Sequence, residues 1–150
     1  MRLRHVIAVC ALGLVTTSCK LGDASDATSI NIYLDISDPQ LTVGQETTTL
    51  TVTARNVGFD PLSFTGPSNC LLYIEIFNSS GLLVWASDTS CDPGTVTEQL
   101  AAGQDKVMTF VWDGKNNGGA FLAPGLYLVR PAARTTGASS LGPPVTIALD

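Results

Sequence analysis

The chain has 150 residues, of which 14% are charged and 45% hydrophobic, and its formal net charge is −5. This length is typical of one domain, and the composition excludes a disordered chain, which would carry more charge and fewer apolar side chains. The 8 Lys and Arg residues form no basic stripe, so the sequence lacks the clustered positive charge that nucleic-acid binding requires.

The first segment of the chain has the three-part layout of a secretory signal. Arg2 and Arg4 precede an apolar run over residues 6–15, and small residues then lead to Cys19. The run is too short to cross a bilayer as a helix. A buried N-terminal helix is the other interpretation, but it fits the basic start and the Thr/Ser break less well. We therefore predict that residues 1–18 are a signal peptide.

The residues before Cys19 resemble the cleavage sites of bacterial lipoproteins, in which an aliphatic residue and two small residues precede the cysteine that takes the lipid. Thr17 and Ser18 are the small residues, while Thr16 occupies the position where the aliphatic residue is preferred. The resemblance implies that Cys19 is lipid-modified, which gives stable membrane anchoring. The alternative is an ordinary signal peptide that is cleaved near Ser18 or Ala24.

Residues 19–29 are then predicted to be the lipidated cysteine and a small, polar, flexible tether. Lys20 follows the cysteine, and in lipoproteins of double-membrane bacteria this feature favours the outer membrane. The predicted location is therefore the cell envelope, with the lipid in the outer membrane and the domain facing the periplasm.

Cleavage of the signal would also remove His5, the one histidine of the chain. Histidine is the commonest general base and metal ligand, and Ser-His and Cys-His nucleophiles both depend on it. We therefore predict that the protein is not an enzyme and holds neither a cofactor nor a metal. Catalysis by carboxylates alone would rest on loop aspartates, which are more often turn-forming residues: Asp60, Asp88, Asp92 and Asp113.

From Ile30 onward, apolar and polar residues alternate with a period of two, which is typical of strands with one buried face. The alternation predicts strands over residues 30–37, 49–55, 71–77, 82–87, 106–112, 125–130 and 145–150. No segment has the period of an amphipathic helix. Seven or eight short antiparallel strands predict an all-β, immunoglobulin-like β-sandwich over residues 30–150. Its large core side chains are predicted to be Trp85, Phe110, Trp112 and Tyr127.

Three connections between these strands are rich in turn residues. Residues 56–69 are predicted to be a loop, and residues 133–144 a long, small and flexible one that could bind a partner. Residues 113–119 could hold calcium through Asp113, Asn117 and Gly118, but Lys115 occupies a ligand position and adds positive charge. A turn between two strands is the simpler interpretation.

Export would place the domain in an oxidising compartment, where disulfides persist. With Cys10 removed in the signal peptide and Cys19 lipidated, Cys70 and Cys91 remain. We predict a disulfide between these two, with a pair of free thiols as the alternative. A metal site is disfavoured because the domain offers two thiolates, no histidine and no C-x-x-C spacing.

The position of this disulfide follows from a predicted hairpin whose turn lies at residues 78–81. If Asn78 pairs with Leu82, counting outward along both strands leaves Cys70 and Cys91 one position from being opposite each other. Their backbones should therefore come close enough for a bridge at the open end of the hairpin.

The stretch from Thr47 to Pro131 resembles the bacterial intracellular proteinase inhibitor (BsuPI) family, because the matching features occur in the same order. These features are a strand ending in Asn56, a loop with a buried Phe64, a hairpin with Gly81 at its turn and Trp85 in its returning strand, a segment through Phe110 into Trp112, and a closing Pro-Gly-x-Tyr strand with Gly125 and Tyr127. They are framework positions, namely turn glycines and core aromatics. Flagellar hook-capping and secretion-associated immunoglobulin-like modules share the closing motif.

The resemblance implies an immunoglobulin-like sandwich that inhibits a subtilisin-like serine protease. It implies no reactive site in this chain, because the matching residues belong to the framework. The family's named inhibitor acts inside the cell, whereas this chain is predicted to be exported. The alternative function is a structural or assembly module that binds another cell-envelope protein, by an edge strand or by end loops.

Overall fold

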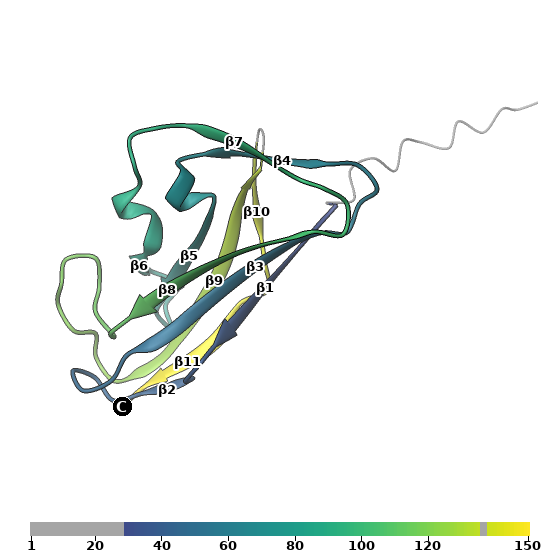
Figure 1. Ribbon diagram of the computed structural model, residues 1–150. Coiled ribbons are helices and arrows are strands. Elements are labelled where there is room, and N and C mark those ends of the chain that lie inside the picture. The colour runs from purple at the N-terminus through teal and green to yellow at the C-terminus, as the bar shows by residue number, and fades with distance from the viewer. Residues whose placement is uncertain (1–28, 136–137) are drawn as a thin grey trace, which may run out of the picture.

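A computed structural model describes residues 29–135 and 138–150 of the chain. These residues form two β-sheets packed as a sandwich (Figure 1), with two 3-10 turns, η1 (Ser68–Cys70) and η2 (Ser87–Ser90). The strands are β1 (Ile30–Ile36), β2 (Gln40–Leu41), β3 (Thr48–Asn56), β4 (Leu62–Gly66), β5 (Leu72–Phe77), β6 (Leu83–Ala86), β7 (Val96–Leu100), β8 (Asp105–Trp112), β9 (Gly125–Thr135), β10 (Ala138–Leu141) and β11 (Val145–Leu149). The all-β, immunoglobulin-like sandwich is confirmed. The predicted signal peptide, Cys19 and the predicted tether up to residue 28 lie outside the described residues.

The smaller sheet contains β1, β3 and β8 in that order, and both of its pairings are antiparallel. On the central strand β3 every second residue is fully buried, namely Leu50, Val52 and Ala54. The threonines between them lie on the outer face, because successive side chains of a strand point to opposite sides. This sheet therefore follows directly from the alternation of the sequence.

The larger sheet is organised around the long strand β9. One side of β9 pairs with β11 near its start and with β10 near its end, while β5 pairs along its other side and carries β6 beyond it. The end of β9 also contacts β4, which pairs with β7. Strand β9 begins at Gly125 with a φ of 151°, a conformation that is accessible only to glycine without strain.

Four aromatic side chains are predicted to lie in the core, and two of them, Trp112 and Tyr127, are buried between the sheets. Trp112 is 1% exposed and Tyr127 is 7% exposed, and their ring centroids are 6.5 Å apart. Trp85 and Phe110 are partly buried and pack against this cluster. Trp85 lies on β6 and Phe110 on β8, which are edge strands of their sheets. Trp112 at the end of β8 is buried because its ring packs against those of Trp85 and Tyr127.

Four strands of the described residues, β2, β4, β7 and β10, lie where the sequence predicted connections. Residues 56–69 contain β4, whose Phe64 is fully buried, and the predicted flexible loop 133–144 contains the end of β9 and all of β10. Strand β7 has no alternation because its first four residues, from Val96 to Gln99, are all exposed. One short pairing, that of β2 with β11, is parallel rather than antiparallel.

Candidate functional site

The exposed segment that follows η2 is anchored at its start by a disulfide and by side-chain hydrogen bonds. Cys91 directly follows this turn and forms a disulfide with Cys70 at the end of η1, with the Cα atoms 5.8 Å apart. The predicted disulfide is therefore confirmed. A β-bulge after Ile76 shifts the pairing of β5 and β6 by one residue, and this shift removes the one-position mismatch that the sequence left between the two cysteines.

Residues 91–95, which we call the anchored loop, connect this disulfide to β7. From Asp92 to Thr95 all residues are exposed, and Cys91 has the extended backbone angles φ −72° and ψ 144°. The side chain of Asn69 holds the start of the loop, because its Oδ1 accepts the Asp92 N–H at 2.9 Å. Its Nδ2 donates to the Ser90 carbonyl at 3.3 Å. Pro93 restricts the loop further by fixing its own φ.

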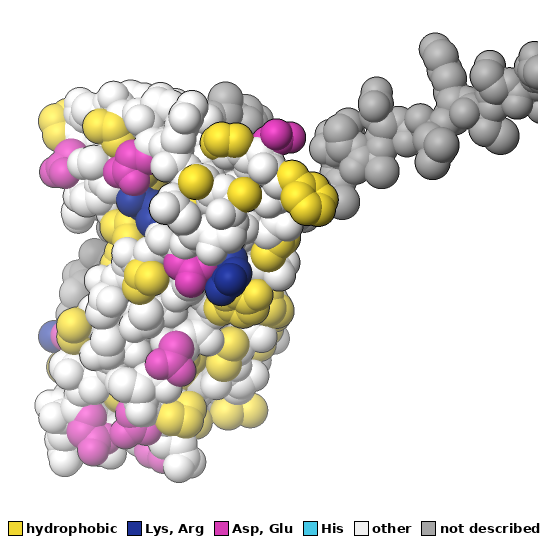
Figure 2. Space-filling view, turned by 45° about the vertical axis from the view of Figure 1, so that its right-hand side comes forward, with side chains coloured by type: hydrophobic (Ala, Val, Ile, Leu, Met, Phe, Trp, Pro, Cys, Tyr) yellow, Lys and Arg dark blue, Asp and Glu magenta, His cyan; other side chains and the backbone are white. Residues whose placement is uncertain are grey.

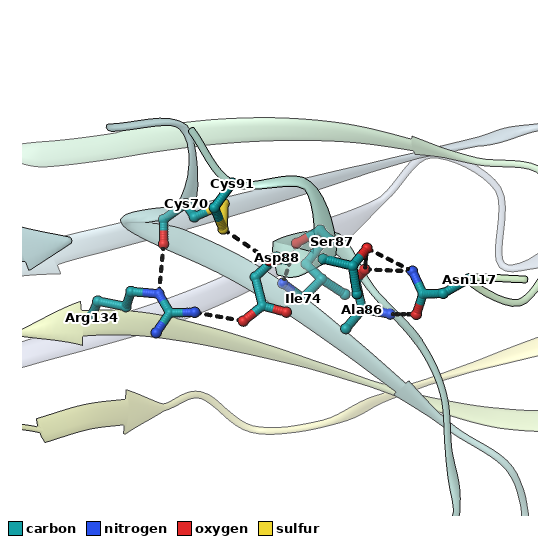
Figure 3. A network of polar contacts seen from close by, with 9 residues as sticks. Cys70, Ile74, Ala86, Ser87, Asp88, Cys91, Asn117 and Arg134 are labelled. Atoms are coloured by element: carbon teal, nitrogen blue, oxygen red, sulfur yellow. Dashed lines mark hydrogen bonds and ion pairs between the residues drawn. A yellow bond between two sulfur atoms is a disulfide. The ribbon is translucent and has the colours of Figure 1, made fainter. Parts of the chain in front are cut away.

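Arg134 at the end of β9 joins both sides of the disulfide (Figure 3). Its Nη2 lies 2.5 Å from Oδ2 of Asp88 in η2, and its Nε donates to the Cys70 carbonyl at 3.2 Å. The guanidinium also lies over the ring of Tyr73, 4.8 Å from the centroid. This side chain therefore connects η1, η2 and the larger sheet through charge-assisted hydrogen bonds.

Asn117, from the connection between β8 and β9, holds the other side of η2. Its amide accepts the Ala86 N–H and donates to the Ala86 carbonyl, both at 2.8 Å, and donates to Thr89 Oγ1 at 3.1 Å (Figure 3). Ala86 lies at the end of the edge strand β6, so the amide satisfies backbone groups that no neighbouring strand pairs with. Asn117 is thus engaged in structural hydrogen bonds.

Replacing Asn117 by alanine should lower the free energy of unfolding by about 1–2 kcal/mol, because it leaves the polar backbone groups of the buried Ala86 without partners. The measurement is denaturant unfolding. Asn31→Ala is the matched control, because the Asn31 side chain makes one exposed hydrogen bond, to Tyr33. Equal unfolding midpoints for the two variants would contradict this role of Asn117.

The loop of residues 113–119, which the sequence predicts to be a turn rather than a calcium site, contains an ion pair. The Lys115 ammonium pairs with the Asp113 carboxylate and lies over the ring of Phe121, 4.6 Å from its centroid. The hydrogen bond from Lys115 lowers the pKa of Asp113 below its ordinary value of 3.8, against the raising effect of burial. Lys115 therefore supplies the positive charge at this carboxylate.

This lowered pKa predicts a small pH dependence of stability. The contribution of the ionised Asp113 is present above the ordinary pKa of 3.8, which applies to the unfolded chain, and is lost as the pH falls through its lower folded pKa. Wild-type protein should therefore be slightly more stable than Asp113→Asn at neutral pH, and the difference should disappear in acid. The effect is small because the side chain is 40% exposed and solvent screens the pair. Thermal unfolding of both proteins from acid to neutral pH measures this stability difference. A difference that does not change with pH would contradict the prediction.

The four loop aspartates that the sequence singled out do not come together. Asp88 pairs with Arg134 and Asp113 with Lys115, Asp92 is exposed on the anchored loop, and Asp60 is exposed in the connection after β3. Within residues 29–135 and 138–150, no group of three or more potential metal-ligating side chains was found. The same part of the chain contains no helix with the length and apolar character needed to cross a bilayer.

Nothing in the sequence indicated that Asn69, Asn117 and Arg134 anchor this segment, and it suggested Asn117 only as a possible calcium ligand. Each lies in a stretch predicted to be a connection or beside one, and each acts on residues at least 21 positions away in the chain. Only the two cysteines and the turn between them carried a local signal for this site.

No family model matches the chain, and no curated protein matches it. Similar folds occur in solved structures of the sporulation control protein of Bacillus subtilis (TM-score 0.52, 8% identity), an alkylpurine DNA glycosylase of Pseudomonas fluorescens (0.51, 15%) and a β-glucosidase of Erythrobacter marinus (0.50, 16%). Each comparison covers 81% of this chain, but only 49%, 30% and 15% of the other chains, respectively. At these identities the likeness shows the fold alone.

Proposed function

We propose that this protein is a non-enzymatic lipoprotein of a bacterial cell envelope, anchored through Cys19, whose domain binds and inhibits a subtilisin-like serine protease through the anchored loop. The observation that carries the proposal is that this loop is exposed and that its start is anchored. Residues 92–95 are exposed, while the disulfide, Asn69 and the Arg134–Asp88 pair hold the backbone on either side of Cys91.

Rigidity matters because an inhibitor that is already ordered loses little conformational entropy when it binds. A mobile loop would lose that entropy in the complex, and as a substrate it would also be released after cleavage. The disulfide fits an oxidising compartment, in agreement with the predicted export. The order of framework features that resembles the BsuPI family adds support for the choice of a serine protease as the partner.

The test is a titration of a panel of subtilisin-like and trypsin-like proteases with the mature protein, with residual protease activity as the readout. We expect stoichiometric inhibition of at least one subtilisin-like enzyme. Asp92→Arg should weaken it, because the side chain is exposed on the loop while Asn69 binds only the backbone N–H of this residue. Asp35→Arg is the matched control, because Asp35 is also an exposed aspartate but lies on β1. The absence of inhibition across the panel, with a folded domain, would overturn the proposal.

A second candidate function is the binding of another cell-envelope protein by the outer face of the larger sheet. Phe77, Leu83 and Leu128 are neighbours in the strand pairing, and Leu83, Leu126 and Leu128 are 45%, 63% and 44% exposed. Beside them Phe77, Leu128, Arg130 and Pro144 line a hollow of 260 Å³. Exposed apolar side chains that cluster in this way are typical of protein interaction sites.

Capture from solubilised envelopes distinguishes this candidate. Leu126→Glu should lose a partner that the wild-type protein retains. Val111→Glu should keep it, because Val111 is similarly exposed, at 66%, but lies on the smaller sheet. Retention of the same partner by Leu126→Glu would exclude this face as the interface.

A further inference from the structure

The connection after β3 lies directly beside the first described residue of the chain. The Ser29 carbonyl accepts the N–H groups of Val57 and Gly58 at 2.7 Å and 3.3 Å. The Gly58 N–H also donates to Oδ1 of Asn56, a fully buried side chain that binds the carbonyls of Asp60 and Leu100 through its Nδ2. The loop of residues 57–59 is therefore fixed to the point where the preceding residues join the domain.

This loop presents an apolar tip to solvent. Phe59 is 99% exposed and Val57 is 48% exposed, and no other large hydrophobic side chain of the described residues is as exposed as Phe59. Hydrophobic side chains are visible on this part of the surface (Figure 2). Burial of the exposed Phe59 ring against an apolar partner would be favourable, because it would remove apolar surface from water. This tip is therefore suited to an apolar partner.

We propose that Val57 and Phe59 enter the interfacial region of the lipid bilayer to which the protein is anchored. The inference rests on the proposed lipid anchor at Cys19. The chain between Cys19 and Ser29 can span at most about 35 Å, so the end of the domain that carries Ser29 stays near the membrane. Val57 and Gly58 attach the loop to that end through their bonds to Ser29, and the ring of Phe59 at its tip is fully exposed. Aromatic side chains are favoured at this depth in a bilayer.

The charges around the loop indicate that the contact is apolar rather than electrostatic. Arg55, one residue before Asn56, faces Asp105 at 3.7 Å, and Asp60 follows Phe59 directly and is exposed. Among the described residues this neighbourhood therefore carries no excess of positive charge, and anionic lipids should not strengthen the contact as they do for a basic surface.

The experiment uses the mature lipid-anchored protein in vesicles of phosphatidylethanolamine and phosphatidylglycerol, with lipids brominated along the acyl chains as quenchers of tryptophan fluorescence. Phe59→Trp places an indole at the tip of the loop. Phe121→Trp is the matched control, because Phe121 is also an exposed phenylalanine, at 52%, but lies beside Gly44 at the opposite end of β3. The wild-type protein supplies the background emission of Trp85 and Trp112.

We expect the emission added by Phe59→Trp to move to shorter wavelength and to be quenched by the brominated lipids, to the same extent when phosphatidylglycerol is reduced. The emission added by Phe121→Trp should stay unquenched. Equal quenching of the two variants, or none for either, would overturn the inference while leaving the anchor intact. Mass spectrometry of the mature chain tests the anchor separately, because a Cys19 without lipid, or a different N-terminus, removes the premise itself.

Discussion

Replacing Cys70 and Cys91 together by alanine should lower the free energy of unfolding by roughly 3 kcal/mol, the stabilisation expected in the chain-entropy model for a loop of this size. The bridge closes a sequence separation of 21 residues. For a domain of this length the loss corresponds to a fall in Tm of roughly 10 °C. Calorimetry of the oxidised wild-type protein and the double variant measures both quantities.

Reduction of the wild-type protein supplies the control for this prediction, because it breaks the same bond without changing the side chains in the core. The two routes should give similar losses. If the double variant unfolds at the same temperature as the oxidised protein, the bridge does not constrain the chain, and the hydrogen bonds of Asn69 and Arg134 alone order the anchored loop.

The double variant also tests the proposed function. If the anchored loop inhibits a protease because it is rigid, loss of the bridge should weaken inhibition or convert the protein into a substrate, even at temperatures where the domain stays folded. Hydrogen exchange of the amides in residues 91–95 reports the added mobility directly. Unchanged inhibition by a folded variant would separate the loop from the inhibition.

Replacing Trp112 by alanine should have an effect of the same size or larger, with a loss of about 3–5 kcal/mol. This side chain is 1% exposed and its ring lies between those of Trp85 and Tyr127, with centroids 6.4 Å and 6.5 Å away. Its Nε1 donates to the Lys115 carbonyl at 2.8 Å, so the substitution also opens the end of the connection that carries Asn117. Denaturant unfolding gives the loss.

Two further substitutions separate the parts of this effect. Trp112→Phe keeps most of the ring volume but leaves the Lys115 carbonyl without its donor, so a smaller loss of about 1–2 kcal/mol is expected. Val111→Ala alters the neighbouring residue, which is 66% exposed, and should change stability by less than about 0.5 kcal/mol. A Trp112→Ala protein as stable as Val111→Ala would contradict the place of this side chain in the core.

Several features of the domain could be predicted from the sequence alone. The alternation over residues 49–55 predicted a strand with one buried face, and the structure places Leu50, Val52 and Ala54 of that face in the core. The hairpin register brought Cys70 and Cys91 together. These features are local, because a strand with one buried face must alternate, and the two arms of a short hairpin are separated by only a few residues.

The rest was decided by tertiary structure. Strand β7 exposes four of its five residues, so no alternation marks it, and only its pairing with β4 makes it a strand. Arg134 reaches Asp88 across 46 positions of the chain, and Asn117 reaches Ala86 across 31. Contacts between residues so far apart in the chain cannot be predicted from the spacing of residues in the sequence. The location of Phe59 beside Ser29 has the same origin, because the pairing of β1 with β3 brings these residues together and leaves the ring in solvent.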